Sequence, residues 1–260
     1  MFSEAVCPRS REPARHVTNR EAAEEPTMTT RQNTTDPPAV TAPGPSLVAP
    51  AVTFVASFVA SLILGPILGA GAAPSPFSDA DAARDYFADN PTVSQITGLV
   101  QFGAAIALGV FTAASLSRMR QLVPNTSAPA IGAVGGSLSA IFLAINGVLQ
   151  WVLGQADITH DEALVQALHH LYFGAGGPAH VGTLGLLVAG IAWMAISAGA
   201  LPRWLSVVGV VIASISVVSL ITFLTSGAAP LVAIGRFTAM IWIVVTAVLV
   251  SRSRRTRTDG

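Results

Sequence analysis

Five polar side chains interrupt otherwise apolar segments of this chain, and their types could do chemistry there. They are a guanidinium, an imidazole and three carboxamides, namely Arg236, His180, Gln101, Asn146 and Gln150. The four-residue spacing of Asn146 and Gln150 puts both on one face of a helix. Burying an ionisable residue is costly unless it is paired or hydrated, so such a residue marks a functional site by default. The set predicts a polar pocket for a small anion or an amphiphile.

Arg236 has no acidic residue within any apolar segment to pair with. Its partner is then a loop carboxylate such as Asp157 or Asp161, a lipid phosphate, water or a bound anion. Arg236 either extends to the membrane surface or forms a structural salt bridge, or else it contacts an anionic ligand. His180 has the same two interpretations, as a hydrogen-bonded structural residue or as a ligand or proton carrier.

Three further histidines, His160, His169 and His170, precede His180 along the chain. Adjacent histidines on a helix point about 100° apart, and the spacing lacks any HExxH zinc motif. We interpret these histidines as a solvated helix face and predict no metal and no cofactor. A membrane-embedded redox enzyme, with His180 and either His169 or His170 as ligands, is a third functional hypothesis.

Several reaction classes lack their usual residues. The sequence contains no phosphate-cradling glycine loop, no GxSxG elbow and no carboxylate pair within the apolar segments. Cys7 is the only cysteine, so one chain has neither a disulfide framework nor a cysteine metal cluster. No nucleic-acid-binding motif is present. The sequence therefore gives no support for hydrolytic, nucleotide-driven or aspartyl-protease chemistry, or for a nucleic-acid partner.

Six long apolar segments must position the polar residues. The chain is 52% hydrophobic and only 11% charged, which is far more apolar than a soluble domain. Each segment is close to the ~20 residues that cross a hydrocarbon core. We predict an all-α polytopic membrane protein, a bundle of six transmembrane helices over residues 47–70, 96–116, 129–151, 178–199, 204–225 and 230–250.

The arginines predict how this bundle is oriented. With both termini inside the cell, only Arg84 of the 14 basic residues lies in an outer loop, and Arg236 lies within a span. The positive-inside rule therefore favours a bacterial inner (plasma) membrane protein with its N- and C-termini in the cytoplasm. All five polar residues then fall in the outer half, so their pocket would open outwards.

Short interfacial helices are expected on the outer side. The first covers residues 79–89 and ends at Asn90-Pro91. The second starts at a capping box made by Thr159 and Glu162, and the glycines of residues 174–177 end it before the fourth span.

The ends of the chain are predicted to be tails. Residues 1–45 have the composition of a disordered cytoplasmic tail, and Met28 is an alternative start that would remove residues 1–27. The first span is predicted to stay uncleaved, within a membrane domain of residues 46–251. Residues 252–260 form a basic cytoplasmic tail that attracts anionic lipid.

Small residues recur at four-residue spacing and predict close helix packing, because helices in lipid associate through such contacts. Packing within one chain is the main interpretation, and a homo-oligomer interface is the alternative. The residues concerned are Thr53, Ser57, Ser61, Gly65 and Gly69 in the first span, Gly132 and Gly136 in the third, and Gly185 and Ala189 in the fourth.

Two short segments carry a family resemblance. Leu201-Pro202-Arg203-Trp204 opens the fifth span, and Gly235-Arg236-Phe237 precedes Trp242 in the sixth. With six spans and an arginine-rich end, the last third of the chain resembles the bacterial membrane proteins grouped as domain of unknown function 4386. The resemblance implies the fold and assigns no activity to any residue.

The leading functional hypothesis is a non-catalytic structural, regulatory or accessory membrane component, in which the polar residues stabilise the bundle. The alternative is binding or transport of a small anion or amphiphile through an outward-facing polar pocket. The lipid bilayer itself is the one partner that the sequence indicates directly.

Overall fold

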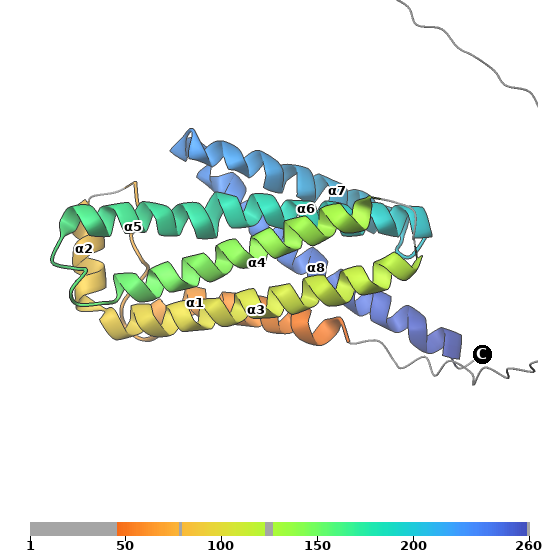
Figure 1. Ribbon diagram of the computed structural model, residues 1–260, viewed down its shortest axis with the longest axis horizontal. Coiled ribbons are helices and arrows are strands. Elements are labelled where there is room, and N and C mark those ends of the chain that lie inside the picture. Colours follow the sequence, from red (N-terminus) through yellow and green to blue (C-terminus); the bar gives the residue numbers. More distant parts are fainter. Residues whose placement is uncertain (1–45, 78–79, 123–126, 259–260) are drawn as a thin grey trace, which may run out of the picture. The chain divides into compact units, whose positions relative to one another are not determined.

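The computed structural model describes residues 46–77, 80–122 and 127–258, and the part of the chain so described is helical, without a strand (Figure 1). The predicted tail of residues 1–45 lies outside the described residues, as do the side chains of residues 252–260. The α-helices are α1 Val48–Ile67, α2 Ala80–Asp89, α3 Pro91–Leu122, α4 Ala128–Leu153, α5 Glu162–Gly174, α6 His180–Ala198, α7 Arg203–Val218 and α8 Ala229–Thr258. Three short turns complete the set, the π-helical η1 Ala175–Ala179 and the 3₁₀-helical η2 Ser219–Phe223 and η3 Ser226–Ala228.

Six helical segments are long and apolar enough to cross a membrane, which confirms the predicted number in the described part of the chain. Several extend beyond the apolar runs. Helix α3 starts at Pro91, immediately after α2, and continues through polar residues to Leu122. A proline suits the first turn of a helix, where its missing N–H would have no partner. Figure 1 shows α2 lying across one end of the long helices, which we call the α2 end of the bundle.

The expected break between the second interfacial helix and the fourth span is present as a kink, not as a loop. Residues Glu162–Ala198 form one helical segment that passes through η1 with a kink at Gly177 (φ −89°, ψ −107°). Pro178 has no N–H and cannot continue the α-helical hydrogen bonds, and the π-turn joins α5 to α6 across this interruption. The N-cap is also corrected, because the Asp161 side chain accepts from Leu164 N (3.1 Å) while Thr159 bonds the Ala156 carbonyl.

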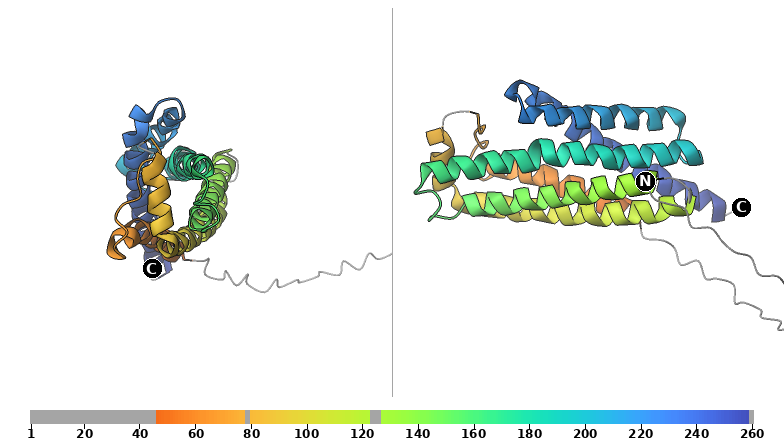
Figure 2. Two further views of the ribbon diagram at one scale, coloured as in Figure 1. Left: turned by 90° about the vertical axis from the view of Figure 1, so that its left-hand side faces the viewer. Right: turned by 45° about the horizontal axis from the view of Figure 1, so that its top comes forward.

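The long helices pack mainly against their neighbours in the chain. Helix α1 contacts α3, α3 contacts α4, α4 contacts α6, α6 contacts α7 and α7 contacts α8. Helix α8 then returns to α1 and closes a ring, in which the α1–α8 contact is the sparsest. The end-on view in Figure 2 shows α3, α4 and α6 curving around one side, with α8 and α1 on the other.

Glycines allow the closest helix contacts, as the small-residue spacing predicts. A Cβ on Gly190 of α6 would lie 2.7 Å from the backbone of Gly132 in α4. Helices α3 and α4 approach equally closely, since a Cβ on Gly147 would lie 2.7 Å from the Gly98 carbonyl oxygen. Packing within the chain is thus confirmed for these helices.

The predicted ridge on α1 is only partly correct. Ser61 and Gly65 are buried, but Thr53 and Gly69 at its ends are exposed. The aromatic side chains Phe54 and Phe58 supply most of the buried face of α1, because their rings reach across the bundle to α6.

Large apolar side chains also cover the outside of the bundle. Leu99, Trp204 and Ile241 are each at least 65% exposed. A soluble monomer rarely exposes so extensive an apolar surface, whereas lipid would cover it without cost.

Candidate functional site

The structure brings three of the five predicted residues to one cavity. Gln101 of α3, Asn146 of α4 and Arg236 of α8 line a space of about 240 Å³. Tyr172 and Phe173 of α5, together with η1 and Leu62 of α1, complete its walls. Gln150 lines a second, neighbouring cavity, and His180 lines neither of these two.

Arg236 is held inside the bundle by groups that carry no charge. Its Nη2 donates a hydrogen bond to the Gly176 carbonyl oxygen, and its guanidinium lies over the Phe58 ring, 5.1 Å from the centroid. Among the described residues no carboxylate lies within 4.0 Å of Arg236, and its Nε has no hydrogen-bond partner. The predicted partner Asp161 instead caps α5. The positive charge therefore faces the cavity without a protein counter-charge.

Two side chains of the cavity bond backbone carbonyl oxygens, one in the π-turn η1 and one at the end of α5. Asn146 Nδ2 donates to the Tyr172 carbonyl oxygen at 2.7 Å, one turn before η1, while Arg236 bonds the carbonyl of Gly176 within it. Only glycine fits at position 176, because a Cβ there would overlap the Asn146 side-chain amide. Asn146 Oδ1 is left without a partner among the described residues. The cavity therefore presents one cation and one unpaired amide oxygen.

His180 is a buried structural residue at the junction of η1 and α6. Its Nδ1 lies 3.0 Å from the Ser139 carbonyl oxygen, which can only accept, so Nδ1 carries the hydrogen. Ser139 Oγ donates to the His180 carbonyl oxygen at 3.0 Å, which is a second hydrogen bond between α4 and α6. The imidazole stacks on Phe58 (centroids 6.2 Å apart, 16° between planes) and is fully buried. Phe58 therefore contacts both predicted ionisable residues.

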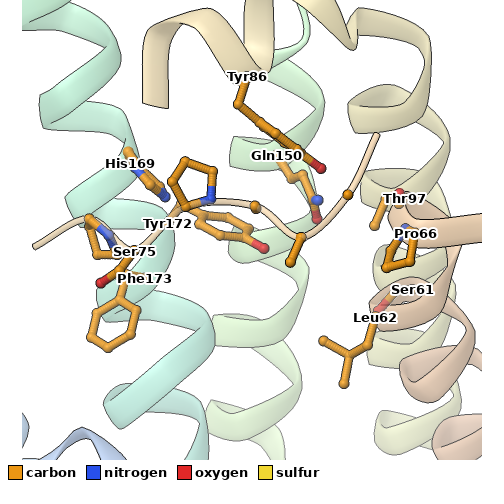
Figure 3. A pocket seen from close by; sticks show the side chains of 16 residues that line it. Ser61, Leu62, Pro66, Ser75, Tyr86, Thr97, Gln150, His169, Tyr172 and Phe173 are labelled. Carbon is orange, nitrogen blue, oxygen red and sulfur yellow. The ribbon is translucent and has the colours of Figure 1, made fainter. Parts of the chain in front are cut away.

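A larger cavity of about 400 Å³ adjoins the first at the α2 end. Leu62, Tyr172 and Phe173 line both cavities. Figure 3 shows Tyr86 from α2 and Tyr172 from α5 extending their rings towards Gln150 of α4. The segment of residues 71–76 also lines this cavity.

The polar groups of this second cavity come from the five helices α1 to α5, and its tyrosines and its amide carry no formal charge. Burial raises the pKa of Tyr86 above 10.0, so its hydroxyl keeps its proton and can donate. Gln150 is 6% exposed, and its Oε1 has no partner among the described residues. His169 is 2% exposed, and its ring contacts Phe87 and Tyr172 with centroids 5.4 and 6.0 Å away. The interpretation of His169 as part of a solvated face is therefore wrong.

A metal site is not formed by the described residues, which contain no group of three or more His, Cys, Asp or Glu side chains placed to hold an ion. His180 is enclosed by Phe54, Phe58 and Ser139, whereas His169 lines the second cavity. The pairing of these two histidines in the redox hypothesis thus receives no support from the geometry.

Sequence reasoning missed several residues of the site. Tyr172 could be recognised only as an aromatic near a membrane interface, and Phe58 as one apolar residue among many. The carbonyl of Gly176 carries no signal of its own, although the Gly-Gly-Pro run of residues 176–178 indicates an interrupted helix.

No protein family model, curated protein or solved structure matches this chain. The resemblance of its last third to domain of unknown function 4386 stays a prediction. Within that third, Trp242 Nε1 donates to the Leu205 carbonyl oxygen at 2.8 Å, and its ring packs where a Cβ on Gly209 would be. Trp242 thus joins α8 to the first half of α7.

Proposed function

We propose that this chain is a multi-pass membrane protein that binds a small anion or an anionic amphiphile in the Arg236 cavity. Six apolar helices and the exposed apolar surface support membrane insertion. The arginine distribution supports cytoplasmic termini in a bacterial inner membrane, with the α2 end outside.

The observation that carries the binding proposal is the unpaired charge of Arg236 beside a cavity. Arg236 is partly buried, and a charge that loses water without gaining a counter-charge costs free energy, which a bound anion would relieve. A guanidinium can hold a carboxylate or a phosphate through two parallel hydrogen bonds. The Gln101 amide lines the same cavity and can donate to a further ligand oxygen, while Asn146 Oδ1 can accept from a ligand donor.

Access from the side of the bundle favours an amphiphile. Leu62 of α1 is 45% exposed and Ala233 of α8 is exposed, and both also line the cavity. The cavity therefore reaches the outer surface between α1 and α8, where the ring contact is sparsest. A lipid-like ligand could place its charged group on Arg236 and keep its chains among the exposed apolar side chains.

A structural role for the same residues is the second candidate. Arg236 joins α8 to the Gly176 carbonyl in η1 and to the Phe58 ring in α1. A guanidinium that clamps three segments would stabilise the bundle without any ligand. This agrees with the leading hypothesis from the sequence, in which the polar residues hold the helices together.

Native mass spectrometry in mild detergent separates the two candidates, with the wild type beside Arg236→Gln. The binding proposal expects an anionic adduct on the wild type that is lost from a folded Arg236→Gln variant. Arg84→Gln is the matched control, because the Arg84 side chain is 43% exposed, lies 3.7 Å from the Asp85 carboxylate and lines neither cavity. A variant that keeps the adduct, or a wild type that carries none beyond bulk lipid, would reject binding at Arg236.

A further inference from the structure

The second cavity has a chemistry different from that of the Arg236 cavity. Its lining contains hydroxyl, amide and imidazole groups but no Asp, Glu, Lys or Arg among the described residues. An ionic group would find no counter-charge there. The cavity therefore suits an uncharged polar group.

The unpaired hydrogen-bonding atoms of this cavity determine which donors and acceptors that group must have. Gln150 Oε1 is buried and needs a donor, while the Tyr86 and Tyr172 hydroxyls can donate to an acceptor. A hydroxyl group both donates and accepts, so it satisfies both requirements. A group that only accepts, such as an ester or a ketone, would leave Gln150 Oε1 unpaired at a cost.

Tyr172 links the two cavities. It lines both, and Figure 3 shows its ring extending into the second cavity towards Gln150. Leu62 and Phe173 are likewise shared. One ligand can therefore occupy both spaces around a common wall.

We infer that the two cavities together bind a single ligand in which a phosphate or similar anion carries a hydroxylated substituent, such as a phosphorylated polyol. The anion pairs with Arg236, and the hydroxyl groups bond Gln150 and Tyr86. This inference rests on the proposed function, because it extends the same site. Such a ligand is either a lipid headgroup or a free polyol phosphate, since both present the same groups.

Binding of defined probes to the purified full-length protein tests this assignment. The probes are short-chain phosphatidylglycerol, phosphatidic acid with the same chains, and free glycerol 1-phosphate. We expect Gln150→Leu and Tyr86→Phe each to weaken binding of the hydroxylated probe roughly tenfold, which corresponds to one lost hydrogen bond, and to leave phosphatidic acid unchanged. Gln166→Leu, on the exposed face of α5, is the matched control.

The outcomes separate failure of this inference from failure of the proposed function. If Arg236→Gln abolishes binding while Gln150→Leu and Tyr86→Phe bind phosphatidylglycerol like the wild type, the anion site stands and the hydroxyl subsite is wrong. If neither lipid probe nor glycerol phosphate binds the wild type, both proposals are wrong. Tighter binding of phosphatidylglycerol than of glycerol 1-phosphate would identify the source as lipid, and equal binding would identify a soluble ligand.

Discussion

Arg236, in the second turn of α8, donates a hydrogen bond to the carbonyl oxygen of Gly176, 60 residues earlier in the π-helical turn. The turn leaves this carbonyl available to α8, because the His180 N–H, which would bond it in an α-helix, bonds the carbonyl oxygens of Ala175 and Gly177 instead. Glycine at position 176 also leaves space for the Asn146 side chain, whose Nδ2 donates a hydrogen bond to the Tyr172 carbonyl oxygen. A local irregularity of one helix thus organises polar groups from two others.

Substitution of Gly176 by alanine is expected to destabilise the protein, because the new Cβ would overlap the Asn146 amide. Overpacking of this kind costs about 1–3 kcal/mol. Thermal denaturation in mild detergent would show a clear fall in the melting temperature of Gly176→Ala.

Two comparisons make the Gly176→Ala measurement specific. Gly103→Ala on α3 places a Cβ in open space and should leave the melting temperature unchanged or slightly raised. The double variant with Asn146→Ala should lose less stability than the sum of the single variants, because the overlapping atoms are gone. Full additivity would contradict the contact.

Phe58 and Arg236 are expected to be energetically coupled. Phe58→Leu removes the aromatic face under the guanidinium, and such a contact contributes about 0.5–2 kcal/mol. A double-mutant cycle of Phe58→Leu and Arg236→Met, followed by denaturation in detergent, should give a coupling free energy in that range. A coupling near zero would show that Phe58 stabilises α1 only by packing, for instance against His180.

Ser139→Ala is expected to loosen the contact between α4 and α6. The hydroxyl donates to the His180 carbonyl and also lies 2.9 Å from His180 Nδ1, so its removal affects two fully buried polar groups. Hydrogen bonds between helices in lipid contribute about 1–2 kcal/mol in peptides. Ser214→Ala is the matched control, because that exposed hydroxyl bonds only within its own helix, and its melting temperature should not change. Equal effects of both variants would contradict an interhelical role.

Much of the fold follows from the sequence, because apolar length and glycine spacing report directly on helices and their contacts. Gly132 shows this, since its predicted close contact is made with Gly190 of α6. The form of the junction between α5 and α6 could not be predicted in the same way. The glycines before Pro178 predict an interruption, but not that it is a kinked π-turn whose Gly176 lies against Asn146 and bonds Arg236.

The site was predictable only in part. Position along a helix placed Gln101, Asn146 and Arg236 at similar depth, but it could not reveal that Gln150 faces a separate cavity. His180 looked like a candidate ligand because imidazole is versatile, yet its hydrogen bonds to Ser139 depend on contact between two helices. Contributions from backbone carbonyls have no sequence signal at all.

The orientation in the membrane predicts a labelling pattern in intact cells. In a Cys7→Ser background, Asp157→Cys lies in the loop between α4 and α5 at the α2 end, and Gln121→Cys lies exposed at the opposite end of α3. If the α2 end is outside, as the positive-inside rule favours, a membrane-impermeant maleimide should label position 157 directly. Position 121 should react only after the membrane is permeabilised. The reverse pattern would place the arginine-rich ends outside and would turn the Arg236 cavity, which lies towards the α2 end, to the cytoplasmic side.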